Sequence, residues 1–294
     1  MEIFGIPVQA LMGQLLLGLI NGSFYAVLSL GLAIIFGLLN IINFAHGAQY
    51  MLGAFAALLG LQYLGVGYWG ALLLAPLVVG VLGVVIEKTM LRHLYKLDHL
   101  YGLLLTFGLA LVAEGVFKNL FGVSGESYAV PEILQGGVRL PFMYLPIYRA
   151  WVVVAALAVC LAAWYTIERT SLGATLRAAT QRPDLVQALG INVPVMITAT
   201  YAVGAALAGF AGVLAAPIVQ VNPVMGSNLI IVVFAVVVIG GMGSILGSIV
   251  TGLGLGIIEG LTKVFYPEAS AVVIFLIMVL VLLVKPAGLF GKQA

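Results

Sequence analysis

The chain consists of long apolar stretches separated by short polar segments. A helix that spans a bilayer needs about 20 predominantly apolar residues, and most of these stretches approach or exceed that length. Two of them are long and are interrupted by polar or glycine-rich residues. The pattern predicts an all-α polytopic membrane protein with about eight transmembrane helices, within a range of eight to ten. The expected spans are residues 10–28, 29–64 (interrupted at 43–47), 69–85, 101–117, 150–167, 195–219, 228–265 (interrupted at 240–244) and 269–284.

The composition agrees with a membrane protein. Of the 294 residues, 63% are hydrophobic and 7% are charged, whereas an average soluble domain has about 25% charged residues. The 37 glycines suit the close approach of membrane helices. A single cysteine, Cys160, excludes a disulfide framework within the chain. Because the first apolar run lacks a preceding basic segment, we expect it to remain as a span and not to be a cleaved signal peptide.

Basic residues set the expected orientation, because cytoplasmic loops of membrane proteins are enriched in lysine and arginine. The segment 118–149 contains acidic residues together with glycine and proline, and we expect it outside. If each interrupted stretch returns to the face it entered from, both termini are cytoplasmic. The residues placed in the cytoplasm are Lys88, Arg92, Lys96, Arg169, Arg177, Arg182, Lys285 and Lys292.

The two halves of the chain share a weak repeat of hydropathy. Each half has a span, then a long interrupted stretch, and then a span that ends on the cytoplasmic side. Transporters are often built from such repeats, with broken helices at corresponding positions beside the transport pathway. The interrupted stretches are therefore expected as broken or re-entrant helices within one transmembrane domain, residues 1–294.

The first interruption, residues 40–47, is the most informative motif. Polar side chains at membrane depth are costly and tend to line cavities. Asn43 and His46 are three residues apart and would share one face of a helix, and Gly47 could release the helical backbone. One interpretation is a helix break beside a transport pathway. The other is an interhelical hydrogen bond that fixes the packing.

The glycine-rich interruption at residues 240–244 does not indicate an enzyme. No Walker sequence GxxxxGK[ST] is present anywhere in the chain, and Ser244 does not lie in a GxSxG motif. Glu259 and Lys263 are four residues apart and are expected to form a structural ion pair. They do not provide the mid-membrane relay that a proton-coupled carrier needs. No cofactor or metal site is expected, and no basic run indicates nucleic acid.

The polar segment 168–195 is expected to be a cytoplasmic loop with a short helix. Pro183 is suited to a first helical position, and Gly190 is suited to a helix end. The apolar side of this helix includes Leu185, Val186 and Leu189. Such a helix is either a connector on the membrane surface or an element that enters a partner's groove.

The sequence resembles the branched-chain amino-acid permease subunits of ABC importers over nearly its whole length. Residues 42–47 (INFAHG) and 50–54 (YMLGA) carry the resemblance, together with 177–179 (RAA), 188–192 (ALGIN) and 240–247 (GGMGSILG). It implies a passive subunit of the bacterial inner membrane with no ATPase activity of its own. The implied partners are a second, related permease, two cytoplasmic ATPases, an external substrate-binding protein and membrane lipid.

The resemblance also implies roles for particular residues. Importers of the wider class carry Glu-Ala-Ala in the coupling loop, and Arg177 stands here in the place of that glutamate. Related permeases carry urea, amides or other amino acids, and an ion-coupled secondary transporter is a less favoured alternative. The residues expected along the substrate pathway are Asn43, His46, Gly47, Gly241, Gly243 and Ser244. Those expected to couple to an ATPase are Arg177, Ala178, Ala179, Asp184, Leu185, Leu189 and Gly190.

Overall fold

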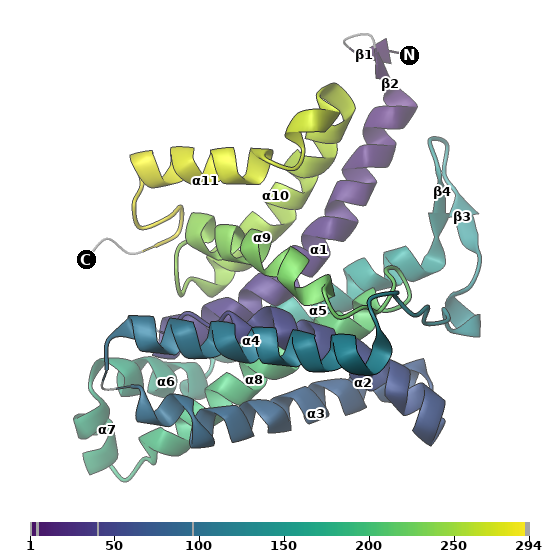
Figure 1. The fold of residues 1–294 in the computed structure, drawn as a ribbon. Coiled ribbons are helices and arrows are strands. Elements are labelled where there is room, and N and C mark those ends of the chain that lie inside the picture. The colour runs from purple at the N-terminus through teal and green to yellow at the C-terminus, as the bar shows by residue number, and fades with distance from the viewer. Residues whose placement is uncertain (1, 4–5, 40, 96, 292–294) are drawn as a thin grey trace.

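The computed structural model describes residues 2–3, 6–39, 41–95 and 97–291, and it is predominantly helical (Figure 1). Short strands form two antiparallel pairs, β1 (Glu2–Ile3) with β2 (Ile6–Pro7) and β3 (Gly137–Arg139) with β4 (Tyr144–Pro146). Single-turn helices are η1 (Leu91–His93), η2 (Glu132–Leu134) and η3 (Pro267–Ala269). The longer helices are α1 (Val8–Leu39), α2 (Ala45–Leu64), α3 (Tyr68–Thr89), α4 (His99–Phe121), α5 (Ile147–Arg169), α6 (Ser171–Gln181), α7 (Pro183–Ala188), α8 (Val193–Ala215), α9 (Met225–Gly240), α10 (Ile245–Phe265) and α11 (Val273–Val284).

The predicted all-α polytopic membrane architecture is confirmed. Within the described ranges, six helices are long and apolar enough to cross a membrane, namely α1, α3, α4, α5, α8 and α10. The apolar helices α9 and α11 are shorter, with 16 and 12 residues. At 1.5 Å per residue they are about 24 and 18 Å long, less than the roughly 30 Å of a hydrocarbon core. Both predicted interruptions are real breaks, between α1 and α2 and between α9 and α10.

The first helix differs from the prediction. Residues 10–28 and the beginning of 29–64 were expected as separate elements, but α1 is one helix of 32 residues. Its sequence has no proline, and the Ser29 hydroxyl donates to the carbonyl oxygens of Ala26 (3.2 Å) and Ser248 (3.2 Å). A polar residue that is satisfied in this way does not end a helix. The second half of the chain therefore has the three parts of the predicted repeat, namely α8, the broken pair α9–α10, and α11. In the first half, the first span and the beginning of the interrupted stretch form one helix, α1.

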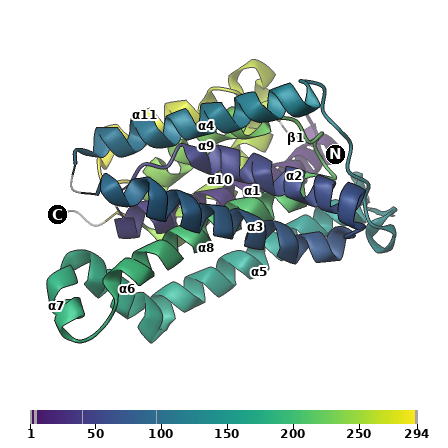
Figure 2. The same cartoon turned by 60° about the horizontal axis from the view of Figure 1, so that its bottom comes forward.

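The start of α1 and the segment that follows α11 lie at opposite ends of the bundle (Figures 1 and 2). Near the start of α1, a Cβ on Gly13 would lie 4.0 Å from Met143 Sδ, beside the β3–β4 hairpin. At the other end of the bundle, with α6 and α7, a Cβ on Gly241 would lie 2.4 Å from the backbone nitrogen of Gly291. On which side of the membrane each terminus lies stays a prediction.

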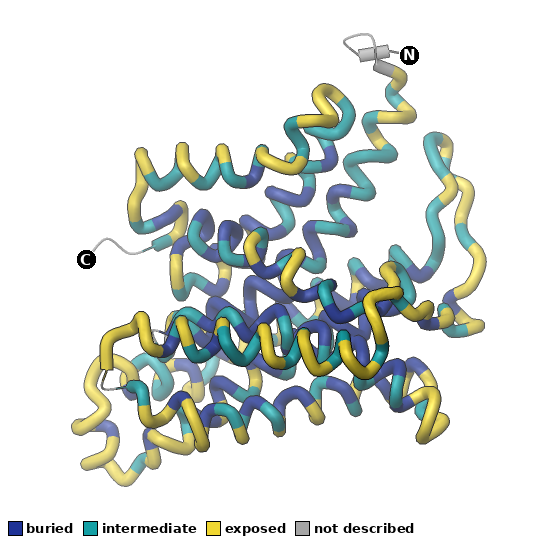
Figure 3. Tube along the Cα trace, in the orientation of Figure 1, coloured by how far each residue is buried: buried dark blue, intermediate teal, exposed yellow. Residues whose placement is uncertain are grey.

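The centre of the bundle is held together by close glycine contacts. Helices α1 and α10 run antiparallel, and a Cβ on Gly256 would lie 2.3 Å from the Cα of Gly22. Helices α2 and α8 are equally close, since a Cβ on Gly53 would lie 2.2 Å from the carbonyl oxygen of Gly209. Because glycine has no side chain, the two backbones of each helix pair can come into direct van der Waals contact. Figure 3 shows the buried residues concentrated at this centre, while the outer face of α4 is exposed.

Candidate functional site

The first helix break is fastened to α4 by one threonine. The Thr106 hydroxyl accepts from the backbone N–H of Phe44 (3.1 Å) and is also 3.1 Å from the carbonyl oxygen of Ile42, to which it donates. These backbone groups have no helical partner, and a buried group without one would cost about 1–3 kcal/mol. The bridge therefore explains how irregular backbone is tolerated at this depth.

Asn43 and His46 lie inside the protein, between the first break and its neighbouring helices. Both side chains are fully buried. Asn43 Nδ2 donates to Gln49 Oε1 (3.4 Å), and Gln49 Nε2 donates to the hydroxyl of Tyr201 on α8 (3.2 Å). His46 Nε2 lies 3.0 Å from the carbonyl oxygen of Leu28. The two residues thus join α1, α2 and α8 in this conformation.

Two polar atoms of this network have no hydrogen-bond partner within the described part of the chain. They are Asn43 Oδ1 and His46 Nδ1. Leaving such buried atoms unpaired is unfavourable. Whether water or substrate reaches them stays a prediction.

Gly47 has a different role from the one its sequence position indicated. It lies within the first turn of α2 and does not release the helical backbone. A Cβ at this position would be 2.7 Å from the carbonyl oxygen of Gly226 on α9. Gly47 therefore permits α2 and α9 to cross closely at the break.

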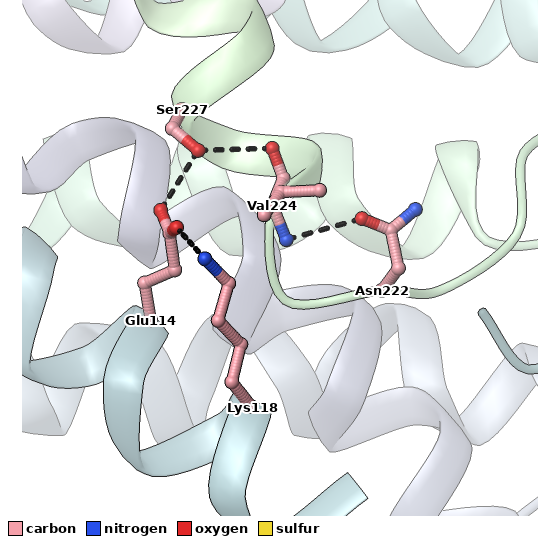
Figure 4. Close-up of polar contacts among 5 residues, drawn as sticks. All are labelled: Glu114, Lys118, Asn222, Val224 and Ser227. Atoms are coloured by element: carbon pink, nitrogen blue, oxygen red, sulfur yellow. Dashed lines mark hydrogen bonds and ion pairs between the residues drawn. The ribbon is translucent and has the colours of Figure 1, made fainter. Parts of the chain in front are cut away.

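Phe44 and Gly47 form one wall of a narrow cavity between α2, α4 and α9, with a volume of about 60 Å³. Its lining is mostly apolar and includes Phe107 and Ile230, but Glu114 and Ser227 also face it. Ser227 Oγ donates to Glu114 Oε2 (2.8 Å), and Lys118 Nζ lies 2.6 Å from Glu114 Oε1 (Figure 4). A carboxylate within a membrane helix is therefore neutralised and aimed at α9 beside an apolar cavity.

The second break, residues 241–244, depends on glycine. Gly241 has φ of 101° and Gly243 has φ of 83°, values that side chains with a Cβ rarely adopt. A Cβ on Gly243 would also lie 2.7 Å from the Cα of Gly37. Ser244 then caps α10, because its hydroxyl accepts from the backbone N–H of Gly247 (3.1 Å).

The second break and the predicted coupling loop share a cavity of about 570 Å³. Gly243 and Ser244 line it on one side, and Glu168 and Arg177 line it on the other. Arg177 Nη1 donates to the carbonyl oxygen of Ile167 (2.7 Å) and lies 3.5 Å from Glu168 Oε2. Arg177 therefore fastens α6 to the end of α5.

The segment after α5 contains two short helices where the sequence predicted one. Helix α7 begins at Pro183 as expected, and Gly190 follows it with φ of 82°. Leu185 and Leu189 are 61% and 80% exposed, respectively. The other residues proposed for coupling divide between surface and interior, with Ala178 and Asp184 exposed and Ala179 buried against Val186 and Val193.

Comparison with known proteins identifies the family. The family model described as "Branched-chain amino acid transport system / permease component" matches residues 14–282. The chain belongs to this permease family. The permease is 31% identical over 299 residues to the high-affinity branched-chain amino acid transport system permease protein BraD of Pseudomonas aeruginosa, covering 95% of each chain. It is 30% identical over 295 residues to LivH of Escherichia coli K12, with the same coverage of both.

A second type of permease is also similar to this one. LivM of Salmonella typhimurium is 27% identical over 300 residues, covering 90% of this permease and 67% of LivM. No solved structure matches the chain. These findings confirm the family resemblance, and membership of a permease family confirms a transport subunit in place of an enzyme.

Several contacts of the permease could not be inferred from its sequence. Thr106 and Ser227 are small polar residues of apolar segments, and their partners Phe44 and Glu114 are 62 and 113 positions away in sequence. Helix α6 was expected as loop. A signal for it is present in the spacing of Leu172, Leu176 and Ala179, which recur at helical intervals.

Proposed function

We propose that this permease forms half of the membrane passage of an ATP-driven importer for branched-chain amino acids. The observation that carries the proposal is the family match over residues 14–282. The partners we propose are a second, related permease, two cytoplasmic ATPases and an external substrate-binding protein. The similarity to permeases of both the LivH and LivM types supports pairing between two related chains.

The energy for uptake would come from the ATPase subunits. The sequence has no Walker motif, and the acidic groups at membrane depth are engaged in local contacts. Glu114 pairs with Lys118, and Glu259 pairs with Lys263 at 2.6 Å. Such i,i+4 pairs do not form a relay across the bilayer, which favours an external source of energy over coupling to an ion gradient.

We place the α6–α7 end of the bundle in the cytoplasm of a bacterial inner membrane. The basic side chains that support this orientation cluster at that end, whereas the lysines at the opposite end are paired with glutamates. In this orientation α1 begins on the outer face and the chain ends inside. The supporting residues are Lys88, Arg92, Arg169, Arg177, Arg182 and Lys285.

The pathway would pass the two helix breaks. At the first break, the apolar lining of Phe44, Phe107 and Ile230 suits an aliphatic side chain. Asn43, His46 and Gly47 would change their packing when the pathway opens. At the second break, Gly241, Gly243 and Ser244 adjoin the larger cavity toward α6.

The coupling element would be the pair α6–α7. Leu185 and Leu189 expose apolar surface on a short helix outside the membrane helices, which suits a groove on an ATPase. Arg177 would connect that surface to α5. Movement of the ATPases would then reach the membrane helices through α5 and α6.

Reconstitution tests the proposal directly. The permease, its partner permease, the ATPases and the binding protein are assembled in proteoliposomes, and uptake of labelled leucine, isoleucine and valine is measured with and without ATP. We expect ATP-dependent uptake that requires every subunit. Preferential uptake of urea or short amides would contradict the proposed substrate. Uptake by this chain alone under a proton or sodium gradient would contradict the proposed ATP-driven mechanism.

A further inference from the structure

A charged groove of about 400 Å³ lies between the end of α3 and the start of α8. It is separate from the narrow cavity beside the first break and from the large cavity beside the second. Glu87, Lys88 and Arg92 contribute its charged lining, and Asn192, Val195 and Thr198 are on the α8 side. The groove therefore presents both signs of charge together with apolar surface.

The acidic wall is a buried carboxylate held by hydroxyl groups. Glu87 is 2% exposed. Its Oε1 accepts from the hydroxyl of Tyr95 (2.7 Å), and its Oε2 accepts from the hydroxyl of Thr198 (2.6 Å). Burial, and then the bond to Glu87, raises the pKa of Tyr95 well above its usual range, so that its hydroxyl stays a donor. Neither oxygen has a cation within 4 Å along the described chain.

The basic wall is formed by two cationic side chains on the α3 side of the groove. Lys88 and Arg92 are exposed, and neither forms an ion pair with the residues the structure describes. They flank Glu87 without neutralising it at short range. A ligand that fits this arrangement has an anionic oxygen for the two cations and a cationic N–H donor for the carboxylate.

The position of the groove indicates a ligand from the membrane. It lies where α3 ends at Thr89 and α8 begins at Val193, the level at which helix ends leave the hydrocarbon core. Val85 and Val195, on the two helices that form the groove, are 50% and 59% exposed. Apolar side chains next to a charged groove suit a molecule with a polar head and acyl chains.

We propose that this groove binds the headgroup of a phospholipid that carries a primary ammonium as well as a phosphate. The phosphate contacts Lys88 and Arg92, the ammonium faces Glu87, and the acyl chains follow Val85 and Val195. A headgroup that is only anionic would bring its charge toward the Glu87 carboxylate, and a quaternary ammonium has no N–H to donate. The groove therefore prefers phosphatidylethanolamine to phosphatidylglycerol and phosphatidylcholine.

The test measures lipid retained by the assembled transporter. The complex is incubated in an equimolar mixture of phosphatidylethanolamine, phosphatidylglycerol and phosphatidylcholine, repurified, and its bound lipids are counted by mass spectrometry. We expect phosphatidylethanolamine to be enriched about tenfold or more, as an added charged contact implies. Lys88→Ala with Arg92→Ala should abolish the enrichment, while Lys285→Ala, a basic residue of the same end outside the groove, should keep it.

Glu87→Gln separates recognition of the ammonium from simple attraction of phosphate. It should retain binding but remove the preference over the other two lipids. Because Glu87 is buried and its variant can fail to fold, the exposed Lys88 and Arg92 provide the independent test. Equal enrichment in the double variant and in Lys285→Ala would overturn the proposal, as would equal retention of all three lipids by the unmodified complex. Displacement of the lipid by millimolar leucine would identify an amino-acid site instead.

Discussion

Replacing Leu185 and Leu189 by aspartate should detach the ATPases from the permease while its membrane helices stay folded. The two side chains are 61% and 80% exposed in the isolated chain. Full burial of a leucine contributes about 1.5–3 kcal/mol, so together these exposed fractions offer roughly 2–4 kcal/mol to an interface. At 1.4 kcal/mol for each factor of ten, truncation to alanine should weaken binding roughly 30- to 1,000-fold. Aspartate adds the cost of burying an unpaired charge, which is several kcal/mol.

The assay is co-purification of the ATPases with a tagged permease, measured beside the amount of permease in the membrane. Val138→Asp is the matched control, because Val138 is 55% exposed on β3 at the opposite end of the bundle. We expect the control to retain the ATPases and the double variant to lose them at an unchanged membrane level. Retained ATPases with hydrolysis still stimulated by substrate would refute the docking of α7. If the double variant and Val138→Asp were lost equally from the membrane, the loss of ATPases would reflect misfolding and would not support the docking of α7.

Three further predictions concern orientation, opening and packing. Reporter fusions should show residue 1 outside and residue 294 inside, and the same side for both would contradict the proposed orientation. Asn43→Cys and His46→Cys should react with a small polar thiol reagent in at least one nucleotide state of the complex, whereas protection in all states would assign them to permanent packing. Gly53→Val should strongly reduce the folded permease, since its Cβ would lie 2.2 Å from a carbonyl oxygen of α8, whereas Gly108→Val, with no atom within 4 Å, should be tolerated. Membrane levels and thermal stability in detergent measure this last difference, and equal levels for both would contradict the packing argument.

The sequence located both breaks because polar or glycine residues interrupt otherwise apolar runs. Asn43 and His46 mark the first break, and the consecutive glycines from Gly240 mark the second. The same reasoning predicted the limits of α7 from Pro183 and Gly190. At the two breaks the local residues disfavour an uninterrupted apolar helix, and at α7 proline and glycine mark the limits. No knowledge of distant contacts is needed for these predictions.

The continuity of α1 could not be predicted in the same way. The polar residues Asn21, Ser23 and Ser29 lie inside α1 without ending it. Ser29 is satisfied partly by Ser248, which is 219 residues away in sequence. The hydrogen-bond partners of the residues at the first break also depend on tertiary structure. His46 was recognisable as a polar residue at membrane depth, but its contact with the carbonyl of Leu28, and the link from Gln49 to Tyr201, follow from how α1, α2 and α8 pack.

The packing restricts which parts of the permease can move during transport. Helices α1 and α10 approach so closely at Gly22 and Gly256 that sliding one past the other would force backbones to separate. Helix α6 is bound to α5 through Arg177, but a cavity of about 570 Å³ separates it from Gly243 at the second break. A displacement of α6 therefore has space to proceed without opening the glycine contacts at the centre. The backbone on the other side of this cavity is the glycine-dependent turn between α9 and α10. We expect the first response to an ATPase to be a change of this turn, followed by α9 at the apolar cavity beside Phe44.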